Sequence, residues 1–391
     1  MRTPRFVWIL CFLLTALVRP SYSCTIVMVS GPDMALAGSN EDSYFPLTMV
    51  WFTPASESTY ARINLGYKMM VNSIQGGMNE KGLFVDGNAL SPTGWQSDPE
   101  KQMVRASILD ILLARCATVE EVKEFFHNFN VPALDRARIP VMDRSGASMV
   151  VEWYKGEVVF LESEDSYQVA TNFVESAYLD KEKPCWRYKA AKKVLGQSKA
   201  HGLARVRKAL DASHQDSEQS RTVYSFICDL EKGEVHVYNY HDFERSVTFN
   251  LKEETEKGFH EHYLGQLFMD RSPAFEMFLQ EAPVRMVETG IGQNIGAGMM
   301  FYTKLKSEYP KAYGMDIPME TLSRVGQNLL EKDRPGDAVF FLKQNTKDFP
   351  DSSRTHYELG MACLAAGMDE QASQALHRAQ EIDPDYRARE E

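Results

Sequence analysis

Apolar residues along the chain follow two different periods, and segments of each kind come in groups. Short β-rich runs such as 25–29 and 148–153 are bounded by turn residues, which is typical of strands. Apolar positions that recur every three or four residues predict helices, for example at 119–129. Because strands come in groups with helices gathered between them, we expect α+β layers and no βαβ alternation. The other predicted strands are 34–37, 68–74, 82–87, 139–142, 157–161, 167–171, 222–229 and 234–240, and the other predicted helices are 103–116, 188–195 and 203–210.

The first 23 residues have the pattern of a secretory signal. Arg2 and Arg5 precede an apolar run at 6–18, and small residues stand at the two positions before Cys24 that a signal peptidase reads. The run is too short for a membrane-spanning helix. We therefore expect an exported protein, periplasmic or extracellular, that begins at Cys24 and has no stable membrane insertion after cleavage. The alternatives are an uncleaved N-terminal anchor and a lipoprotein with a lipidated Cys24.

The C-terminal part of the chain contains a repeat with a period of 34 residues. Its spacing and residue types resemble the tetratricopeptide repeat, a helix-turn-helix unit in which small residues let the helices approach and a proline ends the second helix. We expect helical repeats over 316–391, stacked on the helix around Ser323 or on the main domain as a packing appendage. The alternative is a groove for a protein partner. The repeated positions are Gly326, Ala338, Leu342 and Pro350, followed by Gly360, Ala372, Leu376 and Pro384.

Composition and charge narrow the classes of function. Hydrophobic residues make up 44% of the chain and charged residues 25%, which is ordinary for a soluble globular protein. The net charge of −11 argues against nucleic acid as a partner, because phosphate binding needs a basic surface. Removal of the leader would leave an odd number of cysteines, so at least one thiol stays unpaired. Cys116, Cys228 and Cys363 are interpreted as small buried residues, and Cys185 as a candidate for a disulfide.

A cysteine at the start of a chain carries its own base. A thiol attacks well as the thiolate, so a neighbouring group must take its proton. The free α-amine of an N-terminal residue titrates near pH ~8, which suits this task, whereas the nitrogen of a mid-chain cysteine is an amide and accepts no proton. Cleavage before Cys24 would therefore create a nucleophile and its base in one residue.

Four segments extend this observation along the chain. In order and spacing they resemble the linear-amide hydrolases, the family that includes choloylglycine hydrolases, penicillin V acylases and acyltransferase-like cysteine peptidases. The resemblance implies a four-layered αββα sandwich, the fold of N-terminal-nucleophile hydrolases, over 24–315, and no cofactor or metal. The segments are Cys24-Thr25 with Gly38-Ser-Asn-Glu-Asp42, then Gly77-Met-Asn-Glu-Lys-Gly-Leu83 with Asp86-Gly-Asn-Ala89, then Ala170-Thr-Asn172, and finally Ser220-Arg-Thr-Val-Tyr-Ser225.

The same resemblance implies roles for individual residues. Asp42 matches the carboxylate that holds and orients the α-ammonium of the nucleophile. Asn172 and Asn88 match the side chains that donate to the oxyanion of the tetrahedral intermediate, with Asn79 as the alternative to Asn88. Arg221 matches the arginine that steadies the thiolate and the acyl group. Asp and Asn are also common in turns, so each match has a structural alternative.

The implied activity is hydrolysis of a linear carbon–nitrogen amide bond of a small N-acyl substrate, through an acyl-thioester on Cys24. Ser39 stands where bile-salt-type enzymes carry an arginine, and its neutral hydroxyl cannot bind a substrate carboxylate in the same way. This departure argues against a bile-salt substrate. Acyl transfer to another amine and a dipeptidase of a related N-terminal-cysteine family are alternative activities. A non-catalytic exported binding protein that acts through the repeats is the alternative from another class.

Three further segments have weaker functional interpretations. The apolar stretch 44–52 follows Asp42 and is either the lining of an acyl pocket or a core strand. The glycines of 290–296 have loose nucleotide-loop spacing, but no strand run precedes them, so we do not expect a nucleotide site. His260 and His262 form a pair in a charged stretch with no third ligand in the sequence pattern, which argues against a metal site.

Overall fold

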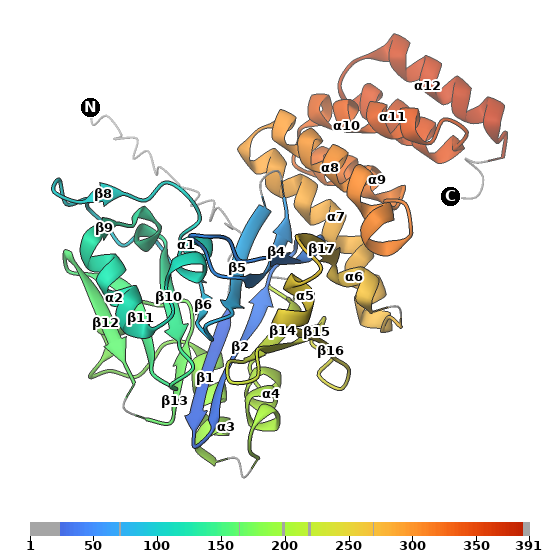
Figure 1. Cartoon of the computed structure of the whole chain (residues 1–391). Helices are drawn as coiled ribbons and strands as arrows, with labels where there is room; N and C mark the ends of the chain where they lie inside the picture. The colour runs from blue at the N-terminus through green and yellow to red at the C-terminus, as the bar shows by residue number, and fades with distance from the viewer. Residues whose placement is uncertain are drawn as a thin grey trace, which may run out of the picture.

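The computed structural model describes residues 24–69, 72–163, 165–197, 200–217, 220–268 and 270–385. The leader expected at 1–23 lies outside these residues. Figure 1 shows a layered body of strands and helices from the N-terminal two thirds of the chain, followed by a helical part that extends away from it.

Two antiparallel sheets form the centre of the described structure. The six-stranded sheet runs β13 (Tyr167–Ala170), β1 (Thr25–Gly31), β2 (Met34–Asp42), β14 (Thr222–Asp229), β15 (Glu234–Asn239) and β16 (Val247–Asn250). The nine-stranded sheet runs β12 (Glu157–Glu162), β11 (Ser148–Tyr154), β10 (Ala137–Met142), β6 (Phe84–Asp86), β5 (Asn72–Asn79), β4 (Arg62–Lys68), β3 (Thr48–Thr53) and β17 (His260–Tyr263), with β7 (Asn88–Ala89) beside β10. A small parallel pair joins β8 (Gln102–Met103) to β9 (Phe129–Asn130).

Alternation of side chains along the strands places the sheets between two layers of helices. On β1, Ile26 and Met28 point into the core between the sheets, while Val27 and Val29 point into a second core beneath α3 (Trp186–Gln197) and α4 (Leu203–Asp211). On the other sheet, the outer faces of β6, β10 and β11 pack on α1 (Ile108–Arg115) and α2 (Val119–Asn128). Two apolar faces on each sheet therefore produce the expected order of layers, αββα.

Most predicted elements are present, with two corrections at the level of single segments. The predicted strand 68–74 is wrong, because β4 ends at Lys68 and β5 begins at Asn72. The predicted helix 103–116 is shorter than expected and begins at Ile108. Two short 3₁₀ turns are also present, Pro132–Asp135 between β9 and β10 and Glu175–Tyr178 between β13 and α3.

The residues after β16 form helices, apart from β17. The 34-residue repeat predicted the last four of these helices, whereas the first four were not predicted. The glycine-rich segment 290–296 is the junction of the two long apolar helices, where the Asn294 side chain caps the second one. Gly290 and Gly298 are in contact there, and a Cβ on Gly290 would lie 2.7 Å from the backbone of Gly298. The helices are α5 (Leu251–Thr255), α6 (Leu264–Leu267), α7 (Pro273–Gln293), α8 (Ile295–Tyr313), α9 (Glu320–Glu331), α10 (Pro335–Asp348), α11 (Ser353–Ala365) and α12 (Asp369–Ile382).

The period of 34 residues is visible in the packing of the last four helices. A Cβ on Gly326 of α9 would lie 2.6 Å from Cγ of Leu342 on α10, and a Cβ on Gly360 of α11 would lie 2.6 Å from Cγ of Leu376 on α12. The same glycine–leucine contact therefore closes both helix pairs. The first pair stacks on α7, where Asn328 donates a 2.9 Å hydrogen bond to Glu288.

The helices α7 and α8 also contact the segment that follows Asp42. Phe45 packs against Phe301 of α8, and the hydroxyl of Tyr313 donates a hydrogen bond to the carbonyl oxygen of Pro46. Phe45 and Leu47 are buried in the core between the sheets, and β3 continues that core. The stretch 44–52 is thus a core segment, as the second of its two interpretations predicted. No helix in the described part of the chain is both long enough and apolar enough to cross a membrane.

Candidate active site

Cys24 lies immediately before β1, at the wall of a cavity of about 540 Å³. Its side chain is 2% exposed. The other walls come from the second sheet and α1, and they include Ile74, Leu109 and Ile139. The thiol therefore stands between the two sheets, where it faces a largely apolar space of the size that small-molecule sites have.

The nearest polar partner of the thiol is Glu41. The Cys24 Sγ donates a 3.2 Å hydrogen bond to one carboxylate oxygen of Glu41, and the hydroxyl of Ser39 donates a 2.6 Å bond to the other. Burial raises the pKa of Glu41 to about 7, although both hydrogen bonds oppose the shift. Burial, and then the neighbouring carboxylates of Glu41, Asp42 and Asp86, raise the pKa of the Cys24 thiol well above its usual range. The resting sulfur is therefore a protonated thiol.

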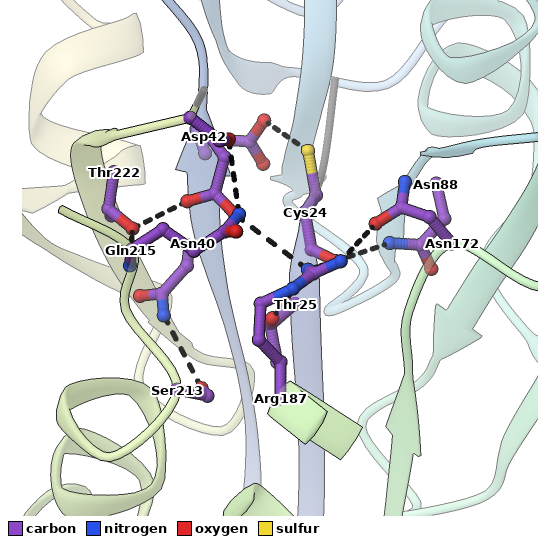
Figure 2. A network of polar contacts seen from close by, with 12 residues as sticks. Cys24, Thr25, Asn40, Asp42, Asn88, Asn172, Arg187, Ser213, Gln215 and Thr222 are labelled. Carbon is purple, nitrogen blue, oxygen red and sulfur yellow. Dashed lines mark hydrogen bonds and ion pairs between the residues drawn. The ribbon is translucent and has the colours of Figure 1, made fainter. Parts of the chain in front are cut away.

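Asp42 follows Glu41 at the end of β2, and its carboxylate is held by two donors. Thr222 donates a 2.5 Å hydrogen bond from its hydroxyl, and the side-chain amide of Gln215 donates a second bond. Burial raises the pKa of Asp42 to about 7, against the positive charge of Arg187 and these hydrogen bonds. Figure 2 shows Asp42 and its donors on one side of the cysteine and Asn88 with Asn172 on the other.

Arg187 connects the two sides of the site. Its guanidinium, on α3, donates a 2.7 Å hydrogen bond to the backbone carbonyl of Cys24 and a 3.0 Å bond to the side-chain oxygen of Asn172. It also lies 3.7 Å from the Asp42 carboxylate and donates to the hydroxyl of Thr25 at 3.0 Å. The guanidinium is buried, so its charge acts at short range in a medium of low polarity. This residue was not among the sequence-predicted site residues.

The two asparagines expected as oxyanion donors both lie beside Cys24. Asn88, on β7, donates a 3.2 Å hydrogen bond to the backbone carbonyl of Cys24, and Asn172 donates a 2.9 Å bond to the carbonyl of Ala89. Asn79 is occupied elsewhere, because its side-chain amide donates to two carbonyl oxygens at the end of α1. Of the two alternatives for this role, Asn88 contacts the nucleophilic residue, whereas the side chain of Asn79 stabilises a turn.

The side chain of Arg221, another predicted site residue, pairs with groups other than those that contact Cys24. Its guanidinium is 3.2 Å from Glu281 of α7 and 3.6 Å from Asp216, and it donates a 3.4 Å hydrogen bond to the hydroxyl of Tyr240. These acids, together with Tyr240, raise its pKa against burial. The positive charge next to the cysteine comes from Arg187 instead.

A third acid, Asp86, approaches the thiol from the second sheet. Its carboxylate accepts a 2.7 Å hydrogen bond from the backbone N–H of Gly87, while its second oxygen is buried and has no hydrogen-bond partner. Burial and the charge of Glu41 raise the pKa of Asp86 well above its usual range. The carboxylate fits because residue 76, opposite on β5, is a glycine, and a Cβ there would lie 2.2 Å from the free oxygen.

The site residues that the sequence analysis did not predict are of two kinds, those inside a family motif and those outside any motif. Thr222 stands inside the fourth family segment, and Glu41 stands beside Asp42, so both were within quoted motifs. Arg187 and Gln215 lie in segments with no motif, and the fold alone brings them to Cys24. The cysteines at 24, 116, 185, 228 and 363 are free in the described structure, so Cys185 forms no disulfide there. Nowhere in the described residues do three His, Cys, Asp or Glu side chains gather as metal ligands would.

Comparison with known protein families gives two matches along the chain. Residues 29–251, more than half of the chain, match the family described as acyl-coenzyme A:6-aminopenicillanic acid acyl-transferase. The match begins five residues after Cys24. Residues 329–389 match a tetratricopeptide repeat model, which confirms the predicted repeats. A sequence search of curated proteins gives no match.

Solved structures similar to this chain include those of two bacterial hydrolases. A variant of the conjugated bile acid hydrolase from Clostridium perfringens is 17% identical, with a TM-score of 0.50 over 61% of this chain and 96% of that one. Penicillin V acylase from Agrobacterium tumefaciens is 17% identical, with a TM-score of 0.48 over 62% of this chain and 91% of that one. The first likeness, together with the four observed layers, confirms the expected fold of N-terminal-nucleophile hydrolases.

Proposed function

The chain belongs to the acyl-coenzyme A:6-aminopenicillanic acid acyl-transferase family, and from this premise we propose that it is an exported amidase with Cys24 as its N-terminal nucleophile. The enzyme cleaves a linear amide bond of an N-acyl substrate. Cys24 attacks the acyl carbon, the amine leaves, and water hydrolyses the acyl-thioester.

The observation that carries this proposal is the position of Cys24. Its thiol lines the cavity, and Asp42, Asn88 and Arg187 surround it from three different elements. A nucleophile with convergent donors at the wall of an apolar cavity is the arrangement that acyl transfer requires. Asn88 donates to the backbone carbonyl of Cys24 and Asn172 to the backbone carbonyl of Ala89, so both amide groups are held near the nucleophilic residue, where they could turn to an oxyanion.

The proposed mechanism also requires a free α-amine on Cys24, which removal of the leader during export would supply. The basic start and the apolar run at 6–18 support removal of a leader before this residue. The released α-amine accepts and donates protons next to the sulfur. Asp42 is the carboxylate of the site that is held in position by two donors, Gln215 and Thr222. The protein then works in the periplasm or outside the cell.

The cavity supports an apolar acyl group as one half of the substrate. Its walls are mainly aliphatic, with Met69, Ile74, Ile108 and Leu109 among them. Burial of such a group would contribute about 0.8 kcal/mol for each methylene. Ser39 donates to Glu41 and offers no positive charge to a substrate carboxylate, so the only cation that lines the cavity among the described residues is Arg136.

The test combines intact-mass analysis with kinetics on a panel of N-acyl amides. Exported protein should have the mass of a chain that begins at Cys24. The Cys24→Ser variant should lose activity by more than about a thousandfold, because a hydroxyl is far harder to deprotonate than a thiol. Cys185→Ser is the matched control, since this free thiol lies outside the site, and it should keep the wild-type rate. A chain that begins elsewhere and still cleaves amides, or an active Cys24→Ser enzyme, would overturn the proposal.

Acyl transfer to an amine is the second candidate, because the family description names a transferase. Both reactions share the acyl-thioester and differ in the group that attacks it. Adding a primary amine to the assay separates them. Formation of a new amide that outcompetes hydrolysis at millimolar amine would assign the chain as a transferase. A mature, correctly processed chain with no turnover on any amide would instead favour a binding protein that acts through the repeats.

A further inference from the structure

Glu41 touches the atom that reacts, and nothing in the mechanism above uses it. The Cys24 Sγ–H points to its carboxylate at 3.2 Å, within a site where both side chains are fully or almost fully buried. A buried carboxylate is costly to keep ionised unless its surroundings compensate for the lost water. The surroundings of Glu41 therefore decide what it does to the thiol.

Two features favour the ionised form of Glu41. Both of its oxygens accept hydrogen bonds, one from the thiol and one from the hydroxyl of Ser39 at 2.6 Å. Asp86, from the opposite sheet, is raised in pKa by burial and by the charge of Glu41, so it is the member of the pair that keeps a proton. With Asp86 neutral, Glu41 is left free to carry the negative charge.

The other ionisable groups around Glu41 do not provide a closer acceptor for the thiol proton. Asp42 is the neighbour on β2, and its carboxylate is occupied by the donors Thr222 and Gln215. The phenol of Tyr224 comes from β14, where burial and the charge of Glu41 raise its pKa well above its usual range, so it stays neutral. Arg187, the nearby cation, is directed to Asp42 and to the backbone of Cys24.

We propose that Glu41 is a catalytic residue that takes the proton of the Cys24 thiol during attack and returns it when the thioester is hydrolysed. This inference rests on the proposed function of Cys24 and refines it by dividing the proton transfers between two groups. Glu41 serves the sulfur. The α-amine of Cys24 serves the leaving nitrogen and the attacking water.

The cycle balances with this division. In acylation the S–H bond breaks and an O–H bond forms on Glu41, while sulfur bonds to the acyl carbon. The carbon–nitrogen bond then breaks, and the α-ammonium gives its proton to the departing nitrogen. In deacylation water bonds to the acyl carbon and gives a proton to the α-amine. The sulfur–carbon bond breaks last, and the thiolate recovers its proton from Glu41.

The Glu41→Gln variant tests the proposal with two readouts that should fall together. Turnover should fall by at least about a hundredfold, the usual contribution of one positioned acid–base group. Alkylation of Cys24 by iodoacetamide at pH 8 should become slower, by about tenfold, because the carboxylate that takes the thiol proton is gone. Peptide mass spectrometry assigns the alkylation to Cys24. If Glu41 acted only through its charge, its removal would instead make the alkylation faster, because a negative charge that favours the protonated thiol would be gone.

Two further variants control for folding and position. Glu41→Asp keeps the carboxylate but shortens it, so it should recover part of the turnover that Glu41→Gln loses. Ser39→Ala removes a hydrogen bond that lowers the pKa of Glu41. The acidic limb of the pH–rate profile should therefore move to higher pH, by up to about one unit. Ser39 is a positioning residue in this scheme, and an unmoved limb would contradict its role.

The outcomes separate this inference from the proposed function. If Glu41→Gln keeps turnover within a few-fold of wild type while Cys24→Ser is inactive, Glu41 is not the acceptor and the nucleophile assignment survives. If Cys24→Ser is active, the proposed function fails and Glu41 loses its role with it. Loss of turnover in Glu41→Gln together with faster alkylation would also overturn the inference, because Glu41 would then hold the thiol in its protonated form and not activate it.

Discussion

Arg187 and Cys24 are 163 residues apart in the chain, yet the guanidinium of the first donates a 2.7 Å hydrogen bond to the backbone carbonyl of the second. The same guanidinium holds Asn172 and lies 3.7 Å from Asp42. One side chain from α3 thus fixes the position of the nucleophile relative to a candidate oxyanion donor and to the carboxylate behind it. No motif in the sequence carries this relationship.

Replacement of Arg187 by lysine should lower activity by about a hundredfold. Lysine keeps the charge, but its compact ammonium cannot reproduce the planar fork that meets Cys24 and Asn172 together. Steady-state kinetics on an N-acyl amide measure the loss. Arg207→Lys is the matched control, because Arg207 lies on the neighbouring α4 and donates to the carbonyl of Phe243. Equal activity of both variants would show that Arg187 has no special function.

The predicted residues that the structure brings together all belong to family motifs, because their side chains have a chemical role there. Cys24, Asp42, Asn88 and Asn172 meet at one place, as the four segments predicted. Arg221 was predicted from its position in a family segment, but the structure pairs it with Glu281 on α7, a helix outside these segments. A motif shows which residue types recur within a family. The partners of a charged side chain also depend on elements outside the motif, such as helices that follow it in the chain.

The same distinction applies to the fold: elements set by a local sequence pattern were predicted, whereas elements that depend on distant packing were not. Strands with β-rich runs and clear turns were predicted correctly, because their pattern is local. The strand predicted at 68–74 is wrong because Met69 lies between β4 and β5, so an apolar run spans the end of one strand and the start of another. The long helices α7 and α8 are apolar on most sides since they pack between the sandwich and the repeats, which removes the one-sided pattern that marks a surface helix.

Replacement of Glu41 by glutamine should stabilise the fold at alkaline pH. Burial raises the pKa of Glu41 from 4.5 to about 7. Between these values the unfolded chain releases the proton first, so the wild-type fold loses stability as the pH rises. Glutamine carries no charge and avoids this loss, so the variant should be more stable above pH 7, by up to about 3 kcal/mol. Denaturant unfolding at pH 4 and pH 8 measures the difference, which should be small at pH 4.

The opposite pattern would assign Glu41 a different role. A variant that is destabilised equally at both pH values would show that Glu41 contributes mainly through the geometry of its hydrogen bonds. Higher stability with lower turnover is expected of a group that is retained for chemistry at a cost to the fold.

Replacement of Gly326 by alanine should destabilise the helical repeats by about 1–3 kcal/mol. The new methyl group would lie 2.6 Å from Cγ of Leu342, a branched carbon that cannot rotate away without moving α10. Gly336→Ala is the matched control, because Gly336 also lies in a helix of the repeats and has no atom within 4 Å of the added carbon. It should be neutral or stabilising, by up to about 1 kcal/mol. Thermal unfolding compares the two, and equal effects would contradict the close helix approach.

The site and the C-terminal helices are joined through α7 and α8. Tyr313 of α8 donates a hydrogen bond to Pro46, four residues after Asp42, and Glu281 of α7 pairs with Arg221, one residue before Thr222. The repeats contact α7 and α8 but lie farther along the helical part in Figure 1. The two parts of the helical region should therefore differ in their importance for catalysis.

Removal of residues 316–391 should leave turnover of a small N-acyl amide within a few-fold of the full chain and lower the unfolding temperature. The site residues belong to the sandwich, and α7 with α8 remains to hold them, whereas loss of α9 exposes the apolar surface of α7 around Val287 and Ile291. A second truncation that ends before Pro273 should abolish activity, because it also removes Glu281 and Tyr313 from the segments beside Asp42 and Thr222. Kinetics per folded molecule, with circular dichroism to count folded chains, separates the two effects. If the shorter deletion alone abolishes turnover while the chain stays folded, the repeats take part in catalysis or in binding the substrate, and their interpretation as a packing appendage is wrong.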